Sequence, residues 1–498
     1  MTKRIYDIYS MFDVTPQQGF PVKFRIFAVA MKLLNTYKPY YKANLRLAFP
    51  VILSQVGNIT VQLADTAMVG HYGGDDPTPL AAVSFATSIF YIVFVAAMGL
   101  SFGLTPLVGE HFARGEKQQS AELLQNGAAL FTALGFLSAG MLILIRPLLD
   151  LLGGVMTGAE VGSAGAVVAA ALPYYDTLVW SMVPIMIVCT VKQFLEGVGN
   201  TRIAMITVII ANAVNIVLNW IFIFGKCGLE PMGAVGAGYA TLIARSLQAV
   251  ILAGYFLLTP RFKDYTADLF SRSMLRLRTM YNILKVGVPI AFQMLMEASA
   301  FVVAGILVLA FGAHAVSAYQ IGTNMMNVTF MIVVAIGSAT TILCSHIYGR
   351  RDFSILRRTV NAAYMMGLAW NVTVAILFII FRYDIPRLFT SNEPTIELTA
   401  TMLIFIALFQ VSDCLQAISI SILRGLQDVK VIMPIVIISY VVFNIPVGYF
   451  LAFDCGFGAV GLIMGFIVGL STCALLTILR VRRDVRRFEA RGVKSVKN

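Results

Sequence analysis

Three carboxylates stand inside long apolar stretches of this sequence: Asp65, Glu297 and Asp413. A charged side chain at the centre of a bilayer costs roughly 2.5–3.5 kcal/mol on insertion scales, and such residues usually mark the path of an ion or a proton. Because the three acids are distributed over both halves of the chain, we predict that they form cation-coupling sites. Neutral, hydrogen-bonded acids that only support packing are the alternative.

Two amides could support such a site. Asn215 and Asn219 are four residues apart and therefore share one face of a helix. Their amide oxygens can bind a cation, and their NH₂ groups can donate to a carboxylate. In a membrane they could also hold two helices together, so direct ligation and a supporting role both stay open.

Other side chains could contact a substrate or form a gate. Arg245 lies within the apolar segment "TLIARSL" and needs a partner or a wet cavity. A salt bridge within the first half of the chain is the simpler expectation for Arg245, and contact with substrate or a gate is the alternative. Phe301 and Phe409 are further candidates for the second role. The four histidines show no metal-site spacing such as HExxH, so we predict no metal site.

The elements that position these residues must be membrane helices. The chain has 498 residues, of which 58% are hydrophobic and 12% are charged, whereas soluble domains carry about 25% charged residues. Apolar runs of about 20 residues, each able to cross ~30 Å of hydrocarbon, recur along the chain. The alternating ten-residue segments of a β-barrel are absent from the sequence. We therefore predict an all-α integral membrane protein with twelve spans, at 46–70, 80–106, 120–145, 162–190, 203–225, 233–259, 283–311, 315–345, 355–381, 396–424, 430–452 and 457–480.

The basic residues indicate an orientation. Of the 37 Lys and Arg residues, 32 fall on one side of the predicted topology, 4 on the other, and Arg245 within a span. By the positive-inside rule, we expect both termini to lie in the cytoplasm and the protein to lie in the cell (inner) membrane. The net charge of +12 is explained by this topology, so we expect no nucleic-acid partner. The six cysteines show no pairing pattern.

The two halves of the chain repeat each other. "LEGVGNTRIAM" (195–205) aligns with "LRGLQDVKVIM" (423–433), and Pro50 aligns with Pro289, which makes Asn58 the partner of Glu297. Each half has six spans, so the repeat is parallel and its pseudo-twofold axis lies along the membrane normal. We expect a cytoplasmic or interfacial N-terminal segment (1–44), an N-lobe (45–260), a cytoplasmic linker (261–282), a C-lobe (283–480) and a basic cytoplasmic tail (481–498). The segment 20–34 is too short and too basic to span; an interfacial helix and a poorly ordered lead-in both stay open for it.

Long motifs carry a resemblance to a known family. "LAFPVILSQVGNITVQLADTAMVGHYGG" (47–74) resembles the first span of the MATE family of multidrug and toxic-compound extruders. "VGVPIAFQMLMEASAFVVAGILVLAFGAHAVSAYQIGTNM" (286–325) and "FQVSDCLQAISISILRGLQD" (409–428) resemble its seventh, eighth and tenth spans. The resemblance covers about 45–480. It implies twelve spans in two lobes and export of cationic, often aromatic compounds by antiport with Na⁺ or H⁺.

The resemblance also implies roles for individual residues. Asp65 matches the acidic residue of the family's N-lobe, and Glu297 and Asp413 match the paired C-lobe acids of its NorM branch. Asn215 and Asn219 match a polar N-lobe pair. Phe409 departs from the pattern, because NorM-type relatives often have Tyr there, and one proposed cation ligand is lost. Branch resemblance alone favours Na⁺ over H⁺.

The sequence therefore predicts a secondary active multidrug efflux transporter of the NorM-like branch, and not an enzyme. Its partners would be small cationic or amphipathic molecules and membrane lipid. It would act as a monomer, with no cofactor beyond the coupling ion. A flippase for lipid-linked oligosaccharides is the alternative within the superfamily, although three acids against one evident base, Arg245, fit a pyrophosphate-bearing substrate poorly. A membrane-embedded enzyme is a more distant alternative.

Overall fold

The computed structural model describes residues 22–73, 76, 78–158, 162–266 and 275–496, and within these ranges it contains helices and no strands. Twelve segments of this described part of the chain are long and apolar enough to cross a membrane, as the sequence predicts. In lipid the backbone must satisfy its own hydrogen bonds, which a helix does and an isolated strand does not.

The first six spans form the N-lobe. Its helices are α2 (Val22–Gly73), α3 (Thr78–Ser101) continued by α4 (Leu104–Ala113), α5 (Lys117–Gly158), α6 (Gly162–Trp180) continued by α7 (Met182–Gly197), α8 (Thr201–Phe224) and α9 (Gly233–Leu258). The short η1 (Pro260–Phe262) and α10 (Lys263–Thr266) follow.

The last six spans form the C-lobe. Its helices are α11 (Leu277–Val308) with η3 (Leu309–Phe311), α12 (Ala313–Arg350), η4 (Phe353–Ile355) with α13 (Leu356–Ile380), α14 (Asp384–Arg387), α15 (Glu393–Gly425) and α18 (Ala459–Val496). The eleventh span consists of α16 (Ile432–Val436), η5 (Ile437–Asn444), α17 (Ile445–Tyr449) and η6 (Phe450–Asp454). Both η segments of this span are wide π-helical turns.

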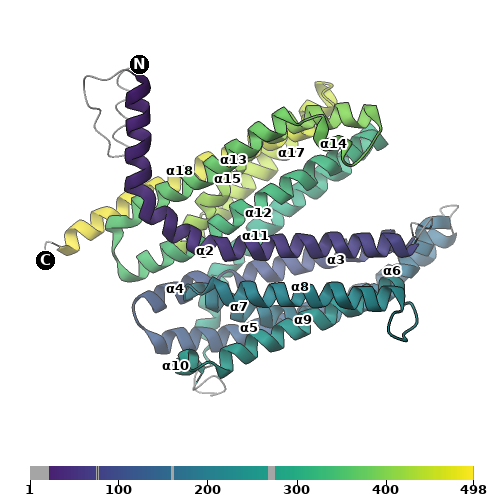
Figure 1. Cartoon of the computed structure of the whole chain (residues 1–498), viewed down its shortest axis with the longest axis horizontal. Coiled ribbons are helices and arrows are strands. Elements are labelled where there is room, and N and C mark those ends of the chain that lie inside the picture. Colours follow the sequence, from purple (N-terminus) through teal and green to yellow (C-terminus); the bar gives the residue numbers. More distant parts are fainter. Residues whose placement is uncertain (1–21, 74–75, 77, 159–161, 267–274, 497–498) are drawn as a thin grey trace.

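The two lobes form a V. They meet at the end that carries α4, α10 and both ends of the described chain, and they diverge toward the end that carries α14 and the start of α6 (Figure 1). Glycines permit the close contact at the joined end. A Cβ added to Gly103 of the N-lobe would lie 2.6 Å from the backbone nitrogen of Gly287 in α11. Small residues let membrane helices approach in this way.

The same packing device appears in both lobes. A Cβ on Gly236 of α9 would lie 2.8 Å from the carbonyl carbon of Phe222 in α8. A Cβ on Gly461 of α18 would lie 2.5 Å from the backbone nitrogen of Ala452 in η6. Both glycines end a "GAVG" sequence, at 233–236 and 458–461, and each allows the last two spans of its lobe to pack closely.

The start of the first span differs from the prediction. Helix α2 begins at Val22, and its span begins at Thr36 rather than at 46. The extra turns contact the C-lobe: the Asn44 amide donates to the Thr340 hydroxyl at 2.9 Å, and the Tyr41 hydroxyl lies 2.9 Å from Met365 Sδ. Sequence patterning missed these turns because they are polar on the side that faces α12 and α13. Residues 1–21 lie outside the described residues, and so do the side chains of 22–35.

Candidate cation and substrate sites

The N-lobe acid lies in an amide network. The Asn219 NH₂ group donates to Asp65 of α2 and, at 3.0 Å, to the amide oxygen of Asn215. The Asn215 NH₂ group approaches the Thr241 hydroxyl at 3.5 Å. The three residues predicted from the sequence are thus brought together by α2 and α8. The four-residue spacing of the asparagines places both on the face of α8 that meets α2.

One atom of this network has no partner. Asn215 and Asn219 are 4% and 0% exposed. The Asn219 amide oxygen is buried and accepts no hydrogen bond within the described structure. A buried acceptor without a donor is costly. It lies on the same side chain that holds Asp65, so a cation bound by the carboxylate could also bind this oxygen.

Arg245 has no acidic partner. Its guanidinium donates to the Ser181 hydroxyl at 2.6 Å and lies 5.2 Å from the ring centre of Phe90 and 5.9 Å from that of Phe94. No carboxylate lies within ion-pair distance of it among the described residues. The expected salt bridge within the N-lobe is therefore wrong. A hydroxyl and two aromatic faces stabilise the charge instead.

The C-lobe acid Glu297 belongs to a longer chain of contacts. The Gln293 amide, one turn earlier on α11, donates to Glu297 at 2.6 Å. Arg424, near the end of α15, donates to the oxygen of the same amide at 2.5 Å. The Arg424 guanidinium also lies 5.8 Å from the ring centre of Phe102, which belongs to the N-lobe. Glu297 is therefore connected through two side chains to the contact between the lobes.

The second C-lobe acid is more deeply buried. Asp413 of α15 is 5% exposed and lies close enough to Glu297 for the two carboxylates to interact electrostatically. Tyr440, in the π-helical turn η5, is 1% exposed and lies within electrostatic reach of both acids. Its hydroxyl donates to Gln416 at 3.4 Å. Glu297, Asp413 and the Tyr440 phenol therefore lie within electrostatic reach of one another.

The two candidate gate aromatics pack on one ring. Phe301 stacks on Phe466 of α18 with ring centres 4.4 Å apart, and Phe409 lies 6.0 Å from the same ring. Phe409 is 1% exposed. It belongs to the core of the C-lobe and does not line the space between the lobes in this structure. Phe301 is half-buried.

Asn58 lies apart from the acids. Its amide oxygen accepts from Asn212 of α8 at 3.3 Å, and its own NH₂ group donates to Gln55 at 3.3 Å. Gln55 in turn approaches Met331 Sδ of α12 at 3.4 Å. Asn58, the repeat partner of Glu297, is thus exposed and borders the C-lobe. Asp65, seven residues later on the same helix, is half-buried.

The three intramembrane acids share one property. None of Asp65, Glu297 and Asp413 has a Lys, Arg or His within ion-pair distance among the described residues. Acids inside a membrane are usually paired with a basic group or with the backbone. Arg245 and Arg424 act on Asp65 and Glu297 only from beyond ion-pair distance.

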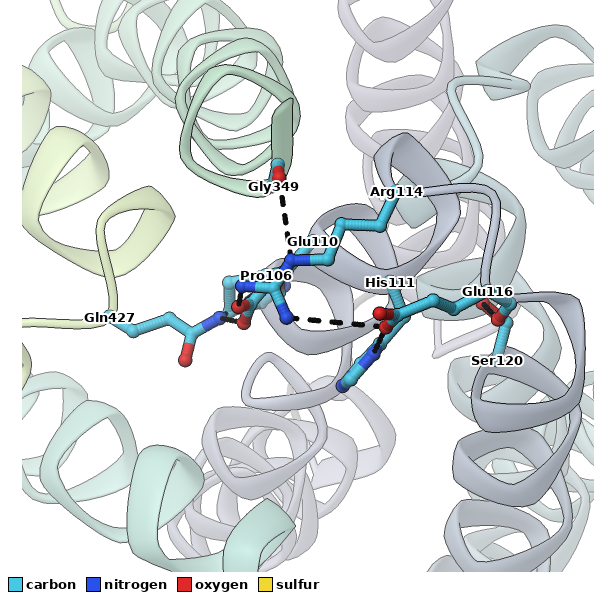
Figure 2. Close-up of polar contacts among 8 residues, drawn as sticks. All are labelled: Pro106, Glu110, His111, Arg114, Glu116, Ser120, Gly349 and Gln427. Carbon is cyan, nitrogen blue, oxygen red and sulfur yellow. Dashed lines mark hydrogen bonds and ion pairs between the residues drawn. The ribbon is translucent and has the colours of Figure 1, made fainter. Parts of the chain in front are cut away.

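A polar cluster closes the joined end of the lobes. Gln427, just after α15, donates to Glu110 of α4, and Arg114 of α4 donates at 3.3 Å to the Gly349 carbonyl of α12 (Figure 2). His346 of α12 lies 2.7 Å from the Gly197 carbonyl of α7. All three contacts join one lobe to the other.

Sequence reasoning missed several of these residues. Arg424 is the last residue of the predicted span 396–424, and a position at the end of a span gives no sign that the side chain contacts the other lobe; the tenth helix continues through it to Gly425. The repeat alignment offered a signal, because it pairs Arg424 with Glu196, and Glu196 is 4% exposed with only Lys192 nearby at 3.9 Å. Charged residues at equivalent ends of two spans would have indicated buried polar groups. Gln293 and Glu110 carried no comparable signal.

A family model, MatE, matches residues 50–221 and 289–450, which is one segment in each lobe and most of the chain. The chain belongs to the MatE family. This is the family that the motifs of the first, seventh, eighth and tenth spans resemble. Its members are transporters, so the chain is a multi-pass membrane transporter and not an enzyme.

Named relatives agree with this assignment. The multidrug resistance protein NorM of Photobacterium profundum is 30% identical over 466 residues, a match that covers 90% of this chain and 96% of the relative. NorM of Vibrio vulnificus is 29% identical over 455 residues, with 90% and 96% covered. A variant of the Vibrio cholerae MATE transporter VcmN is 19% identical in sequence, and its structure superposes with a TM-score of 0.78 over 91% of this chain and 98% of that one. The last likeness shows that the fold is shared.

Proposed function

We propose that this MatE transporter exports cationic and aromatic compounds from the cell in antiport with Na⁺ or H⁺. The names of its relatives, multidrug resistance proteins, support multidrug efflux. The chain supplies the coupling from its own residues: one acid in the N-lobe and two in the C-lobe. Because one chain carries both lobes, the proposed unit is a monomer.

The absence of an ion pair at any of the three acids is the observation that carries the proposal, although Arg245 and Arg424 lie within electrostatic reach of Asp65 and Glu297. Asp65, Glu297 and Asp413 lie inside spans, yet no Lys, Arg or His of the described residues pairs with them. An unpaired charge in a membrane is costly, and a bound cation or proton removes that cost. Exchange of one cation for another at such an acid is the elementary step of antiport.

The N-lobe fits a coupling ion. The Asp65 carboxylate and the orphaned Asn219 oxygen offer two hard oxygen ligands on facing helices. We propose that Na⁺ binds here, with H⁺ as the alternative, and that Glu297 and Asp413 bind the cationic group of the substrate or a second ion. The branch resemblance favours Na⁺, whereas Phe409 offers no hydroxyl to the C-lobe site.

The V shape supports a proposal about the state of the transporter. The joined end of the lobes carries both ends of the described chain, and we propose that this end lies in the cytoplasm, which the excess of Lys and Arg on that side of the predicted topology supports. The structure then corresponds to a state open to the outside. We propose that the lobes, 45–260 and 283–480, rock as units about the repeat axis and that the contacts of Glu110, Arg114 and His346 break in the inward-open state.

The coupling requires a difference between states. A ligand shifts the equilibrium only if it binds the two states with different affinity. Arg424 gives the C-lobe such a difference, because it contacts Gln293 in its own lobe and Phe102 in the other. When the lobes separate at this end, the contact with Phe102 is lost and the charge beside Glu297 changes its surroundings.

Dye transport into inverted membrane vesicles tests this proposal. We expect a cationic dye to accumulate when an opposing Na⁺ or proton gradient is imposed, and to leak out when that gradient is collapsed. Asp65→Asn should abolish this accumulation at equal expression. Asp150→Asn, which removes an acid already paired with Arg146 at 3.1 Å, is the matched control and should transport normally. Dye accumulation that ignores both gradients would overturn the proposal.

A further inference from the structure

A basic groove lies between the lobes at their joined end. It has a volume of about 480 Å³ and is lined by Ala113, Arg114, Glu116, Gly349, Arg350 and Arg351. Ala113 ends α4 of the N-lobe, and Arg114 and Glu116 follow it. Gly349 and Arg350 end α12 of the C-lobe, and Arg351 follows that helix. A groove of this size falls within the range of small-molecule sites, roughly 300–1,000 Å³.

Two of its three arginines are uncommitted. Arg114 already contacts Glu110 and the Gly349 carbonyl, and lies 4.0 Å from Glu116 (Figure 2). Arg350 and Arg351 are exposed, and neither has an ion pair among the described residues. The nearest acid in sequence, Asp352, accepts from the Ser354 hydroxyl at 2.5 Å. The groove thus offers two free guanidiniums beside a third that is already held in place.

The backbone at Arg351 points to a role for its side chain. Arg351 follows the last turn of α12 with φ of 57°, in the left-handed region, and its N–H donates to the Tyr348 carbonyl at 3.3 Å. Glycine fills such a helix-ending position with the least strain. The chain instead places an arginine there, which directs a second positive side chain into the groove beside Arg350.

The groove depends on contact between the lobes. A Cβ on Gly349 would collide with the carbonyl oxygen of Glu110 and would lie 3.0 Å from Ala113 Cβ. Only a glycine therefore allows α12 to touch α4 at this point. Because the lining residues come from both helices, the groove exists in this form only while this end of the transporter is closed.

We propose that this groove binds a phosphate-bearing anion and that the bound anion holds the two lobes together. Guanidiniums bind phosphate oxygens through paired, charge-assisted hydrogen bonds. The groove lies at the basic end of the molecule, where the acidic headgroups of the membrane surface are concentrated. The anion is either the headgroup of an anionic lipid or a soluble phosphate. The inference concerns binding and closure, so it does not depend on which compounds the transporter exports.

Thermal unfolding of the purified full-length chain tests the site with two probes. The first probe is phosphatidylglycerol added to phosphatidylcholine micelles. The second is inorganic phosphate, exchanged for chloride at constant ionic strength in phosphatidylcholine alone. We expect at least one probe to raise the unfolding temperature in a saturable way. Saturation by the lipid alone identifies a headgroup, and saturation by inorganic phosphate identifies a soluble anion.

Two double variants separate the groove from general surface charge. Arg350→Gln with Arg351→Gln should weaken the apparent affinity for the effective probe by about tenfold or more, because two charge-assisted contacts are lost. Arg483→Gln with Arg486→Gln removes the same charge from exposed positions on α18 and should leave the affinity unchanged. The proposal is overturned if neither probe stabilises the wild type, or if both double variants lose the effect equally.

A glycine pair tests the dependence on closure. Gly349→Ala keeps every arginine but separates α12 from α4, so it should weaken the same probe by several-fold. Gly254→Ala, on α9, adds a methyl group where no atom lies within 4 Å, and it should have no effect. Unchanged affinity in Gly349→Ala would overturn the claim that the anion joins the lobes.

Discussion

The two lobes hold their acids in different ways. In the N-lobe, Asp65 is bound by Asn219 and the nearby base Arg245 by Ser181, so every contact stays within the lobe. In the C-lobe, Glu297 is linked through Gln293 to Arg424, whose guanidinium rests on Phe102 of the other lobe. Under the proposed function, a cation bound at Asp65 would change a local network, whereas one bound at Glu297 would change a network that crosses the lobe interface.

This difference suggests a division of labour. The N-lobe site offers a single carboxylate with two amides, which suits a small coupling ion. The C-lobe site offers two carboxylates that interact with each other, which suits a larger or more highly charged guest. Substitutions at Asp65 would then alter ion binding, whereas substitutions at Arg424 would alter the movement of the lobes.

The largest effect should come from Asp65→Asn. Asparagine keeps the size and the contact with Asn219 but cannot exchange a cation. We expect efflux of a cationic and of a neutral dye to fall alike, by at least about tenfold, equivalent to ~1.4 kcal/mol. Dye efflux at matched expression measures this. Normal efflux of both dyes would remove Asp65 from the mechanism.

The C-lobe acids should separate the two dyes. In Glu297→Gln and Asp413→Asn, one negative charge remains beside the site. We expect the loss of cationic dye efflux to be several-fold greater than that of neutral dye efflux, because the missing charge attracted the substrate. The same pair of dyes measured on both variants decides the matter. Equal losses would assign these acids to the ion as well, and the division between the lobes would fail.

A third comparison uses the repeat itself. Asn219→Ala removes a hydrogen bond to a carboxylate, worth ~1.5–3 kcal/mol, so the ion concentration for half-maximal efflux should rise by about tenfold or more. Asn444→Ala is the matched control. Asn444 of "FNIPVGY" (443–449) aligns with Asn215 of "VNIVLNW" (214–220) in the repeat, but its NH₂ group is buried and donates to no partner in the described structure. Ion titration of efflux in both variants tests this. An equal shift in Asn444→Ala would show that the two repeats are functionally alike.

Arg424 and Arg245 should differ in their effect on the contact between the lobes. Arg424→Gln removes a cation–π contact between the lobes, worth ~0.5–1 kcal/mol, so the ratio of closed to open molecules at the joined end should fall by about two- to fivefold and the closed proportion should fall with it. Arg245→Gln removes similar contacts inside one lobe and should leave that proportion unchanged. Distance distributions between spin labels on α4 and α12 report it. If Arg245→Gln moves the lobes as much, Arg424 is not the link.

The smallest effect should come from Phe409→Tyr. The ring is buried against Phe466, so a hydroxyl there adds one oxygen to the C-lobe interior without reaching the space between the lobes. We expect the ion concentration for half-maximal efflux to change by less than about threefold, which is within the spread of energies measured for single hydrogen bonds. A change of tenfold or more would place residue 409 at the ion site.

The number and type of the helices could be predicted from the sequence because hydropathy reports directly on burial in lipid. The acids were found because an Asp or Glu in an apolar run is conspicuous. The contact between Asp65 and Asn219 could not be predicted as a pair, since 154 residues separate them and only the packing of α2 on α8 unites them. The spacing of Asn215 and Asn219 predicted only that they share a face.

The residues that link the lobes were hidden for a physical reason. Arg424, Glu110 and Gln427 lie at helix ends, where polar residues are common, and nothing local distinguishes an end that is buried against another lobe from one in water. Arg245 shows the opposite error. The burial of Arg245 was evident from the sequence, but its partners are a hydroxyl and two aromatic rings rather than an acid. Aromatic residues are common in apolar segments, so the sequence does not show which of them contacts an arginine.

The most direct test of the central claim is whether substrate binding displaces the coupling ion. Purified protein would be equilibrated with radiolabelled Na⁺, or held in weak buffer for proton counting, and then titrated with a cationic substrate. The account predicts that the substrate releases bound Na⁺ or H⁺ from the wild type, and that no ion is released from a variant carrying Asp65→Asn, Glu297→Gln and Asp413→Asn. Substrate that binds the wild type without displacing either ion would contradict it.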